Sequence, residues 1–283
     1  MSIVLATNSY GKSAVRLVKV ERSGAHHDIR EMAVDIALEG SFDDAHTAGD
    51  NSRVLPTDTM KNTVYAKARE LRLGAPEDFA LALAQHFLGA SPAASASRVT
   101  VTERGWRRLE VNGVEHDHAF ERKSAEVQMA RIALARGGTA EVVAGIDDLL
   151  ILKSARSAFS GYPRDRYTTL RETDDRILAT SLSTHWRYRA ATVDFTARFA
   201  EVRRALLETF ADHDSKSVQH TLYAMGEAVL SRCAEVEEIS ITMPNKHHLL
   251  VDLAPLGLDN ANEICVPTSE PYGLIEATLK RQM

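Results

Sequence analysis

The sequence predicts an α+β protein of two tandem repeats, each a four-stranded antiparallel sheet with two helices on one face. Two observations lead to this fold class. Apolar periodicities give the order strand, strand, helix, helix, strand, strand twice along the 283 residues. The helical segment TMKNTVYA at 59–66 also shares three residues with SVQHTLYA at 217–224. We place the boundary near the two glycines at 137–138, so that the repeats cover residues 1–137 and 138–283.

The first repeat shows its elements through alternation and through turn residues. Asn112 and Gly113 are typical of the tight turn of a hairpin. Pro76 favours the first turn of a helix, and Gly74 ends the helix before it. The expected elements are strands at Ala14–Glu21 and Ile29–Glu39, helices at 57–73 and 75–89, and two strands within 97–120.

The second repeat shows the same order. Between its first two strands, segment 162–176 is dense in charge and poor in apolar residues, which predicts a loop. The expected elements are strands at 145–157 and 176–190, helices at 194–214 and 217–233, and a closing pair of strands at 236–243 and 247–255. Helices on one face leave the edges of each sheet open, so we expect association with other copies of the chain.

Composition and charge exclude several classes of protein. The chain is 44% hydrophobic and 26% charged with a net charge of −5, which disfavours a general binder of nucleic acids or membrane surfaces. No apolar run approaches the roughly 18 residues of a membrane span, and the first residues lack the pattern of a secretion signal. We therefore expect an ordinary soluble globular protein.

Metal binding is not expected from the cysteines and histidines. Cys233 and Cys265 are the only cysteines, and they lie too far apart in the sequence for a zinc motif. Two cysteines also fit a reducing compartment better than a disulfide framework. The histidine pairs His26–His27 and His116/His118 fall at turns, without a supporting pattern of carboxylates or cysteines.

The starts of two helices are candidate sites for a small anion. The first four N–H groups of a helix lack partners within it, so a helix start binds anions as well as capping side chains. Thr57 and Asp58 lie at one such start. Gln219 lies in the first turn of another helix, which we take as the equivalent helix of the second repeat. The alternative for both is an ordinary capped helix.

Arg176 and Phe159 are candidate ligand contacts near the charged loop. Arg176 directly precedes a predicted strand, where its planar guanidinium would present two donors to a carbonyl or an anion. Phe159 lies near Gly161, where its ring would stack on a ligand. The alternatives are a solvated surface loop and a phenylalanine of the core.

The segment ITMPNKHHLLVDL at 241–253 places hydrogen-bonding groups inside a predicted strand. Residues two apart in a strand share a face, so Asn245 and His247 are expected to point one way and His248 the other. Lys12 precedes the first predicted strand. Buried beside hydroxyl groups, this lysine would act as a base.

Five motifs together resemble urate oxidase (uricase): YGKSAVRLVKV, PTDTMKNTVYAKA, FSGYPRDRYTTLRETDDRILAT, SVQHTLYAMGEAVL and MPNKHHLLVDL. The similarity runs from about Tyr10 to the final SEPYGLIEATLKR, nearly the full chain. The resemblance implies the tunnelling fold (T-fold), with two repeats per subunit, sheets that close into a barrel in the oligomer, and a homotetramer with active sites at dimer interfaces. It also implies oxidation of urate with O2 and water to 5-hydroxyisourate and H2O2, by a factor-independent hydroxylase without metal or organic cofactor.

The resemblance further implies roles for individual residues. Lys12, Thr57 and His247 would form the catalytic group. The implied substrate-binding residues are Thr57, Asp58, Phe159, Arg176, Val218, Gln219 and Asn245. The sequence departs from the family at Ser160 and Tyr162, which affects the loop around the stacking ring more than the contacts themselves.

Each implied contact suits a part of the purine. Arg176 and Gln219 would grip its edge, and Phe159 would stack on its ring. The backbone at the starts of the two helices would complete the contacts in the ring plane. Asn245 together with Thr57 would hold oxygen or water above the ring.

Two other functions stay open on the residues alone. One is another T-fold enzyme that acts on a purine or pterin, such as a cyclohydrolase, although the zinc enzymes of that kind need Cys and His ligands that this chain lacks. The other is a non-catalytic purine-binding protein. The chain ends in KRQM rather than in a peroxisomal address, so we expect a cytoplasmic protein of bacterial type.

Overall fold

The computed structural model describes residues 3–282 and divides into two compact units. The first unit holds the residues up to Gly145 together with Arg187–Ala197. The second holds Ile146–Trp186 and the residues from Arg198 onward. The proposed boundary between sequence repeats, at 137–138, lies in the turn that precedes β5 (Glu141–Lys153), and it stays a proposal.

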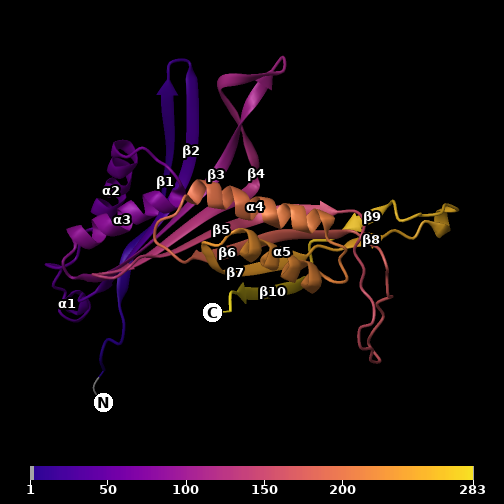
Figure 1. The fold of residues 1–283 in the computed structure, drawn as a ribbon. Coiled ribbons are helices and arrows are strands. Elements are labelled where there is room, and N and C mark those ends of the chain that lie inside the picture. The colour runs from indigo at the N-terminus through magenta and orange to yellow at the C-terminus, as the bar shows by residue number, and fades with distance from the viewer. Residues whose placement is uncertain (1–2, 283) are drawn as a thin grey trace. The chain divides into compact units, whose positions relative to one another are not determined.

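The first unit is an antiparallel sheet with helices packed on it (Figure 1). Its strands follow the order β1-β2-β3-β4. On β2 the side chains of Met32, Val34, Ile36 and Leu38 are buried, while the residues between them are partly exposed. This period of two shows that one face of the sheet carries the core. The elements are β1 (Ser9–Ser23), β2 (His26–Gly40), α1 (Asp43–Thr47), α2 (Thr57–Glu70), α3 (Pro76–Ala90), β3 (Ala94–Val111) and β4 (Val114–Ala135).

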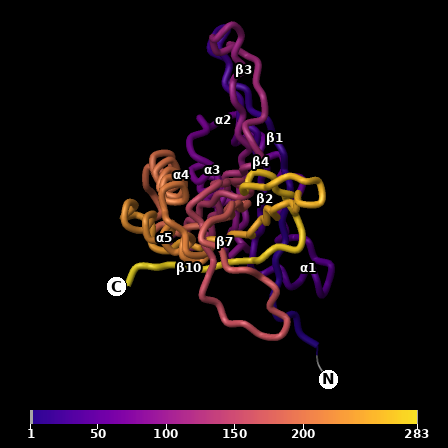
Figure 2. Tube along the Cα trace, turned by 90° about the vertical axis from the view of Figure 1, so that its right-hand side faces the viewer, coloured from indigo at the N-terminus to yellow at the C-terminus, as the bar shows by residue number. Residues whose placement is uncertain are grey.

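The strands of the first unit are longer than predicted, and their ends form two projecting hairpins. The tips of β1–β2 and of β3–β4 extend beyond the helices (Figures 1 and 2). The predicted turn between β3 and β4 is confirmed, because Asn112 and Gly113 both have positive φ values, 54° and 78°. The predicted hairpin of the first two strands is also confirmed, with its turn at Gly24.

The second unit repeats the arrangement of a sheet with two helices. Its strands follow the order β5-β6-β7-β10, and α5 packs on β7 and β10. Trp186, Leu182, Met225 and Ile241 are almost fully buried in its core. Besides β5, the elements are β6 (Leu178–Tyr188), α4 (Phe195–Asp212), α5 (Val218–Arg232), β7 (Val236–Asn245), β8 (His248–Leu250), the 3-10 turn η1 (Ala254–Leu256), β9 (Cys265–Pro267) and β10 (Gly273–Lys280).

The predicted closing pair of strands is wrong. β7 ends at Asn245, and β8 pairs with β9 in a separate two-stranded sheet instead of returning along β7. The antiparallel partner of β7 is β10, which starts opposite Asn245 at Gly273. β10 can pack closely on α5 because Gly226 carries no side chain: a Cβ there would lie 2.9 Å from Cδ1 of Leu279. The sequence pattern at 247–255 gives no hint of this distant partner.

The predicted equivalence of the two helices with shared residues is also wrong in chain order. α2 is the first long helix after its strand pair, whereas α5 is the second after its own, so α5 corresponds in order to α3. Of the shared residues, Tyr65 and Tyr223 are both exposed, whereas Thr221 is buried and Thr63 is not. A similarity of helix residues is not a similarity of position in the fold.

Within residues 3–282, no helix is both long and apolar enough to cross a membrane.

Candidate active site

Lys12 lies inside β1, not just before it as the sequence suggested. A bulge explains the difference, because the pairing of β1 with β2 shifts register between Lys12 and Val15. Ala14 takes a φ of 54° there, and its N–H donates to Oδ1 of Asp35 at 2.8 Å. The bulge interrupts the alternation, so the strand seemed to begin at Ala14. Before it, β1 runs so close to β2 that a Cβ on Gly11 would lie 1.7 Å from the carbonyl oxygen of Ile36.

Thr57 and Asp58 open α2, whose start has no side-chain cap. The residue before the helix is Pro56, which offers no side-chain acceptor to the first N–H groups. The carboxylate of Asp58 turns to its own helix, where it pairs with Lys61 and accepts from Nδ2 of Asn62 at 3.1 Å. The hydrogen bond from Lys61 lowers the pKa of Asp58 most, and the charge of Lys12 lowers it further. α2 packs against β1, the strand that carries Lys12.

The second unit contains a cavity of about 260 Å³ that collects the remaining predicted residues. Of these, Val218 is buried, Gln219 is exposed, and the others are partly buried. The predicted residues that line the cavity are Phe159, Arg176, Val218, Gln219, Asn245 and His247. Sequence reasoning missed the other lining residues, which are Leu170, Ile177, His248, Leu249 and Ile275. Apart from their place in the sequence near the quoted motifs, nothing marks the four apolar side chains among them as part of a site.

Three chain segments lie side by side and hold the cavity wall. The N–H of Ala158 donates to the carbonyl of Ser215 at 2.8 Å, just before α5. Phe159 and Thr173 exchange both backbone hydrogen bonds, at 2.8 and 3.1 Å. The carboxylate of Asp175 accepts from the N–H of Ser157 at 3.2 Å. These hydrogen bonds tie the backbone at Phe159 to the residues before Arg176 and to the start of α5.

The start of α5, unlike that of α2, is capped. Oγ of Ser217 accepts the N–H of His220 at 3.1 Å. Val218 and Gln219 follow directly, so their backbone and side chains lie at the positive end of the helix dipole. The cap fixes the first turn and leaves the Gln219 amide on the cavity wall.

Arg176 is a half-buried cation without a carboxylate partner among residues 3–282. Burial lowers the pKa of its guanidinium. Its Cζ lies 5.3 Å from the ring centroid of Phe159, so the charge sits over an aromatic face. A partly desolvated charge is costly unless it is paired, and the open side of this one is the cavity. The site is therefore suited to an anion.

Both histidines after β7 line the cavity, and His248 also lines a second cavity together with Lys246 and Ala179. β7 ends at Asn245, and the chain leaves the strand when the N–H of Lys246 donates to the carbonyl of Ala179 at 2.9 Å. The two-residue period of a strand no longer applies beyond that point. Asn245 and His247 do share the cavity as predicted, but loop geometry brings His248 there as well.

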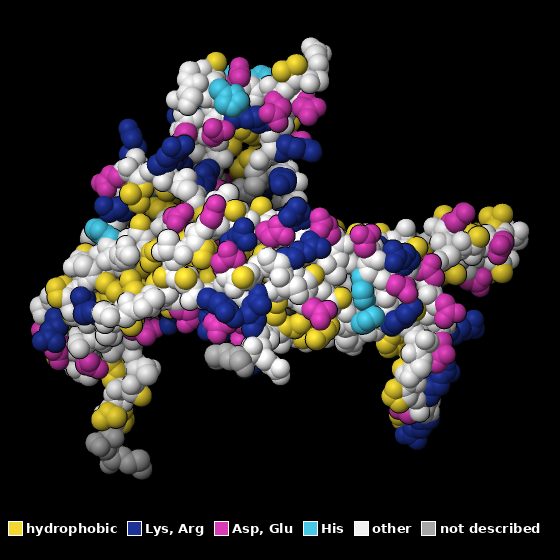
Figure 3. All heavy atoms as spheres, viewed as in Figure 1, with side chains coloured by type: hydrophobic (Ala, Val, Ile, Leu, Met, Phe, Trp, Pro, Cys, Tyr) yellow, Lys and Arg dark blue, Asp and Glu magenta, His cyan; other side chains and the backbone are white. Residues whose placement is uncertain are grey.

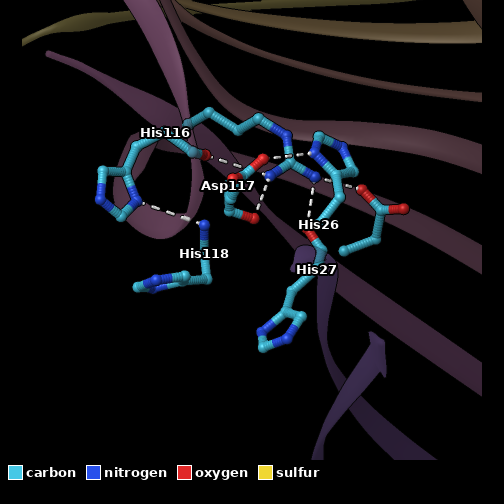
Figure 4. A network of polar contacts seen from close by, with 7 residues as sticks. His26, His27, His116, Asp117 and His118 are labelled. Carbon is cyan, nitrogen blue, oxygen red and sulfur yellow. Dashed lines mark hydrogen bonds and ion pairs between the residues drawn. The ribbon is translucent and has the colours of Figure 1, made fainter. Parts of the chain in front are cut away.

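The histidine pairs His26–His27 and His116/His118 meet at the tips of the first-unit hairpins. Nδ1 of His26 lies 3.2 Å from Oδ1 of Asp117, and Nδ1 of His116 accepts the N–H of His118 at 3.3 Å (Figure 4). Arg108 joins the two hairpins by donating to Asp28 at 2.6 Å. Figure 3 shows that this projecting tip is mixed in charge. No group of three side chains suited to a metal ion occurs there or elsewhere in the described part of the chain.

One titratable residue that sequence reasoning missed lies away from these groups. Glu77 in the first turn of α3 is completely buried, and among the described residues its carboxylate has no hydrogen-bond partner from another residue. Burial raises its pKa to about 7. The nearest charges include Arg30, which pairs with Glu103 instead.

Comparison with known proteins agrees with the motifs and the fold. The sequence model of the Uricase family matches residues 8–133 and 142–276. A uricase from Arthrobacter globiformis is 48% identical over 99% of this chain and 91% of its own length, and a uricase from Oryctolagus cuniculus is 38% identical over 97% and 93%. A crystal structure of the Arthrobacter globiformis uricase superposes with a TM-score of 0.94 over 100% of this chain and 96% of that one.

The crystal structure of a uricase from Bacillus fastidious superposes with a TM-score of 0.82 at 24% identity, so the fold is shared although most residues differ. The predicted α+β T-fold is thus confirmed. On the family match, the near-complete coverage and the shared fold, this chain belongs to the uricase family.

Proposed function

We propose that this member of the uricase family oxidises urate at a site to which two copies of the chain contribute. The reaction converts urate, O2 and water to 5-hydroxyisourate and H2O2. The observation that carries the proposal is the half-buried guanidinium of Arg176, which lines one cavity with Gln219, Asn245 and His247. An anionic purine supplies the negative charge that this guanidinium lacks within the described chain.

The cavity offers complementary groups to each part of urate. Arg176 presents two parallel donors to the anion. The amide of Gln219 provides one donor and one acceptor, which matches a lactam edge. The N–H groups at the start of α5, including that of Val218, favour negative charge in the ring plane. The ring of Phe159 covers one face of the purine.

The reaction requires deprotonation of urate and an O2 molecule held close to its ring, and it needs no added electron carrier. The urate anion is rich in electrons and can itself reduce O2. Thr57 is a poor base alone, so Lys12 takes its proton and His247 relays it. Asn245 and Thr57 hold O2, and then water, above the ring, which supplies the orientation that a bimolecular step lacks in solution.

The two sets of residues meet across a subunit interface in this proposal. Lys12, Thr57 and Asp58 come from the first unit of one copy, and the cavity residues come from the second unit of its partner. Large apolar side chains support association, because Leu249, Leu250, Val266 and Leu274 are each more than half exposed. A two-fold dimer then has two equivalent sites, its sheets close into a barrel, and two dimers stack into a homotetramer.

Urate-dependent consumption of O2 and release of H2O2 test the activity. The purified protein should form H2O2 on addition of urate, and exhaustive treatment with a chelator should leave the rate unchanged. Activity that disappears with the chelator and returns with a metal ion would contradict the cofactor-free mechanism. Absence of H2O2 under any of these conditions would contradict the proposed function itself.

Mixing two inactive variants tests whether the site is shared. Thr57→Ala and Arg176→Ala should each be nearly inactive. A mixed dimer of the two carries both substitutions in one site and neither in the other, so about half of the sites of such a dimer should recover. Tagged co-purification confirms that mixed dimers form. Mixed dimers as inactive as their parents would show that each site is built within one chain.

The compartment is also a proposal. Cys233 and Cys265 are both free thiols. Free cysteines fit the reducing cytoplasm, where we place the protein.

A further inference from the structure

We propose that Tyr162 is a positioning residue that holds the ring of Phe159 in place for stacking on the substrate. The two rings are nearly parallel, with an interplanar angle of 14° and centroids 4.9 Å apart. Phe159 lines the cavity, and so does Leu170, whose carbonyl oxygen accepts the hydroxyl of Tyr162. This inference rests on the proposed role of Phe159 in binding the purine.

The side chain of Tyr162 is itself held by contacts to its hydroxyl and to its ring. Its hydroxyl donates to the carbonyl oxygen of Leu170 at 2.7 Å, across the loop. The guanidinium Cζ of Arg164 lies 5.5 Å from its ring centroid. Arg164 also lies 3.6 Å from Oε1 of Glu172, which accepts the N–H of Gly161 at 3.2 Å. The tyrosine therefore has a fixed orientation although it belongs to a loop.

The hydrogen bonds of the Phe159 backbone do not by themselves fix the orientation of its ring. The loop around Tyr162 projects from the second unit without helix or strand, and Figure 3 shows Lys and Arg side chains gathered on it. Gly161 has a φ of 71°, so the chain turns sharply between the two aromatic residues and brings their rings together. The Phe159 ring also contacts Arg176, whose Cζ lies 5.3 Å from the ring centroid.

An aromatic ring fixed by stacking binds a planar ligand more tightly than a free one. A side chain that is already ordered does not lose rotamer freedom when the ligand binds. The hydroxyl of Tyr162 supplies part of that order through the Leu170 carbonyl, which a phenylalanine at this position would not reach. Tyr162 therefore acts on substrate affinity through Phe159, not on the chemical step.

Substitutions at Tyr162 and Phe159 test the proposal. For each variant, the affinity for xanthine, a purine that lacks the C8 oxygen, is measured by titration, and kcat and KM are measured for urate. Tyr162→Leu should weaken xanthine binding by about two- to tenfold, the fold-change of one aromatic pair, and should raise KM for urate while kcat changes little. Tyr162→Phe, which keeps the stacked ring, should restore most of the affinity. Tyr167→Leu is the matched control, because that exposed tyrosine lies in the same loop.

A double-mutant cycle separates this proposal from the proposed function. If Tyr162 acts through Phe159, the variant with both Phe159→Leu and Tyr162→Leu should bind xanthine no more weakly than Phe159→Leu alone. Additive losses, or a Tyr162→Leu variant that matches Tyr167→Leu, would overturn the positioning role.

A Phe159→Leu variant with unchanged affinity would instead overturn substrate stacking at Phe159. If Tyr162→Leu does not fold, Tyr162→Met fills a similar volume without a ring and enters the same cycle with the same two outcomes. The thermal midpoint and oligomeric state of every variant are measured alongside, so that a loss of affinity is compared only among folded proteins.

Discussion

The starts of α2 and α5 are built differently although both are assigned to one ligand. α2 follows Pro56 and has no side-chain cap, whereas the Oγ of Ser217 caps α5. The hydrogen bond from Lys61 lowers the pKa of Asp58 at the α2 start most, and the charge of Lys12 lowers it further. The α5 start forms part of the cavity wall, and backbone hydrogen bonds at Ala158 and Phe159 hold that wall in place.

We propose that this difference separates chemistry from recognition. The first unit presents a hydroxyl and a lysine at an open helix start, which suits proton transfer. The second unit surrounds a small cavity with a cation, an amide and an aromatic ring, which suits binding of a planar anion. Substitutions at the two helix starts should therefore affect different kinetic constants.

The largest expected effect is on catalysis at the α2 start. Thr57→Ala and Lys12→Met should each slow urate oxidation by about 10²–10⁴-fold, the typical loss on removal of a general base. Xanthine binding, measured by titration, should change far less. Thr59→Ala removes an exposed hydroxyl from the same helical turn and serves as the control. A Thr57→Ala variant that binds no xanthine would assign this residue to recognition instead.

A third helix start sharpens the comparison, because α3 buries a carboxyl in its first turn. Glu77 has a pKa of about 7, above the ordinary 4.5. The folded state therefore favours the protonated form, and the free energy of unfolding should fall as the pH rises from about 4.5 to about 7 and then level off. Ionisation of this group costs at most about 3 kcal/mol over that window.

Glu77→Gln removes this titration and tests its sign. The variant should be more stable than the parent at pH 8 and should lose that advantage near pH 4.5, measured by thermal unfolding at fixed protein concentration. Glu115→Gln, at an exposed carboxyl, is the control. A stability difference that does not change with pH would show that Glu77 does not titrate in this window.

Arg176→Ala probes recognition by the second unit. Loss of a charge-assisted contact should weaken xanthine binding by about 1.5–3 kcal/mol, roughly 10- to 150-fold. The matched control is Arg171→Ala, an exposed arginine of the same loop. If kcat falls while affinity for xanthine is unchanged, Arg176 belongs to the chemical step and the separation of the two units by role is wrong.

The smallest expected effect is on the helix caps. Ser217→Ala removes the cap of α5 and should lower the free energy of unfolding by about 1 kcal/mol, visible as a lower thermal midpoint. Pro56→Ala should not lose a cap hydrogen bond, because Pro56 provides none at the start of α2. Equal shifts for the two variants would contradict the difference between the two helix starts.

The sequence by itself predicted the fold class, the helices and most strands. Alternation and turn residues are local signals: the buried set Met32, Val34 and Ile36 shows the expected period of two, and Asn112–Gly113 forms the expected turn. The motifs also named six of the residues that line the cavity, because sequence similarity to the family extends over nearly the whole chain. These features depend on residues close in sequence or on direct sequence likeness.

Only the tertiary structure decided which strands pair and which side chains reach the cavity. β7 pairs with β10 instead of the next segment, and Leu279 of β10 packs against Gly226 of α5, more than fifty positions away in the sequence. The bulge after Lys12 depends on the carboxylate of Asp35 on the neighbouring strand. His248 reaches the cavity because β7 stops at Asn245. Contacts between distant segments are set by packing and hydrogen bonding in the folded chain, and no local pattern of residues records them.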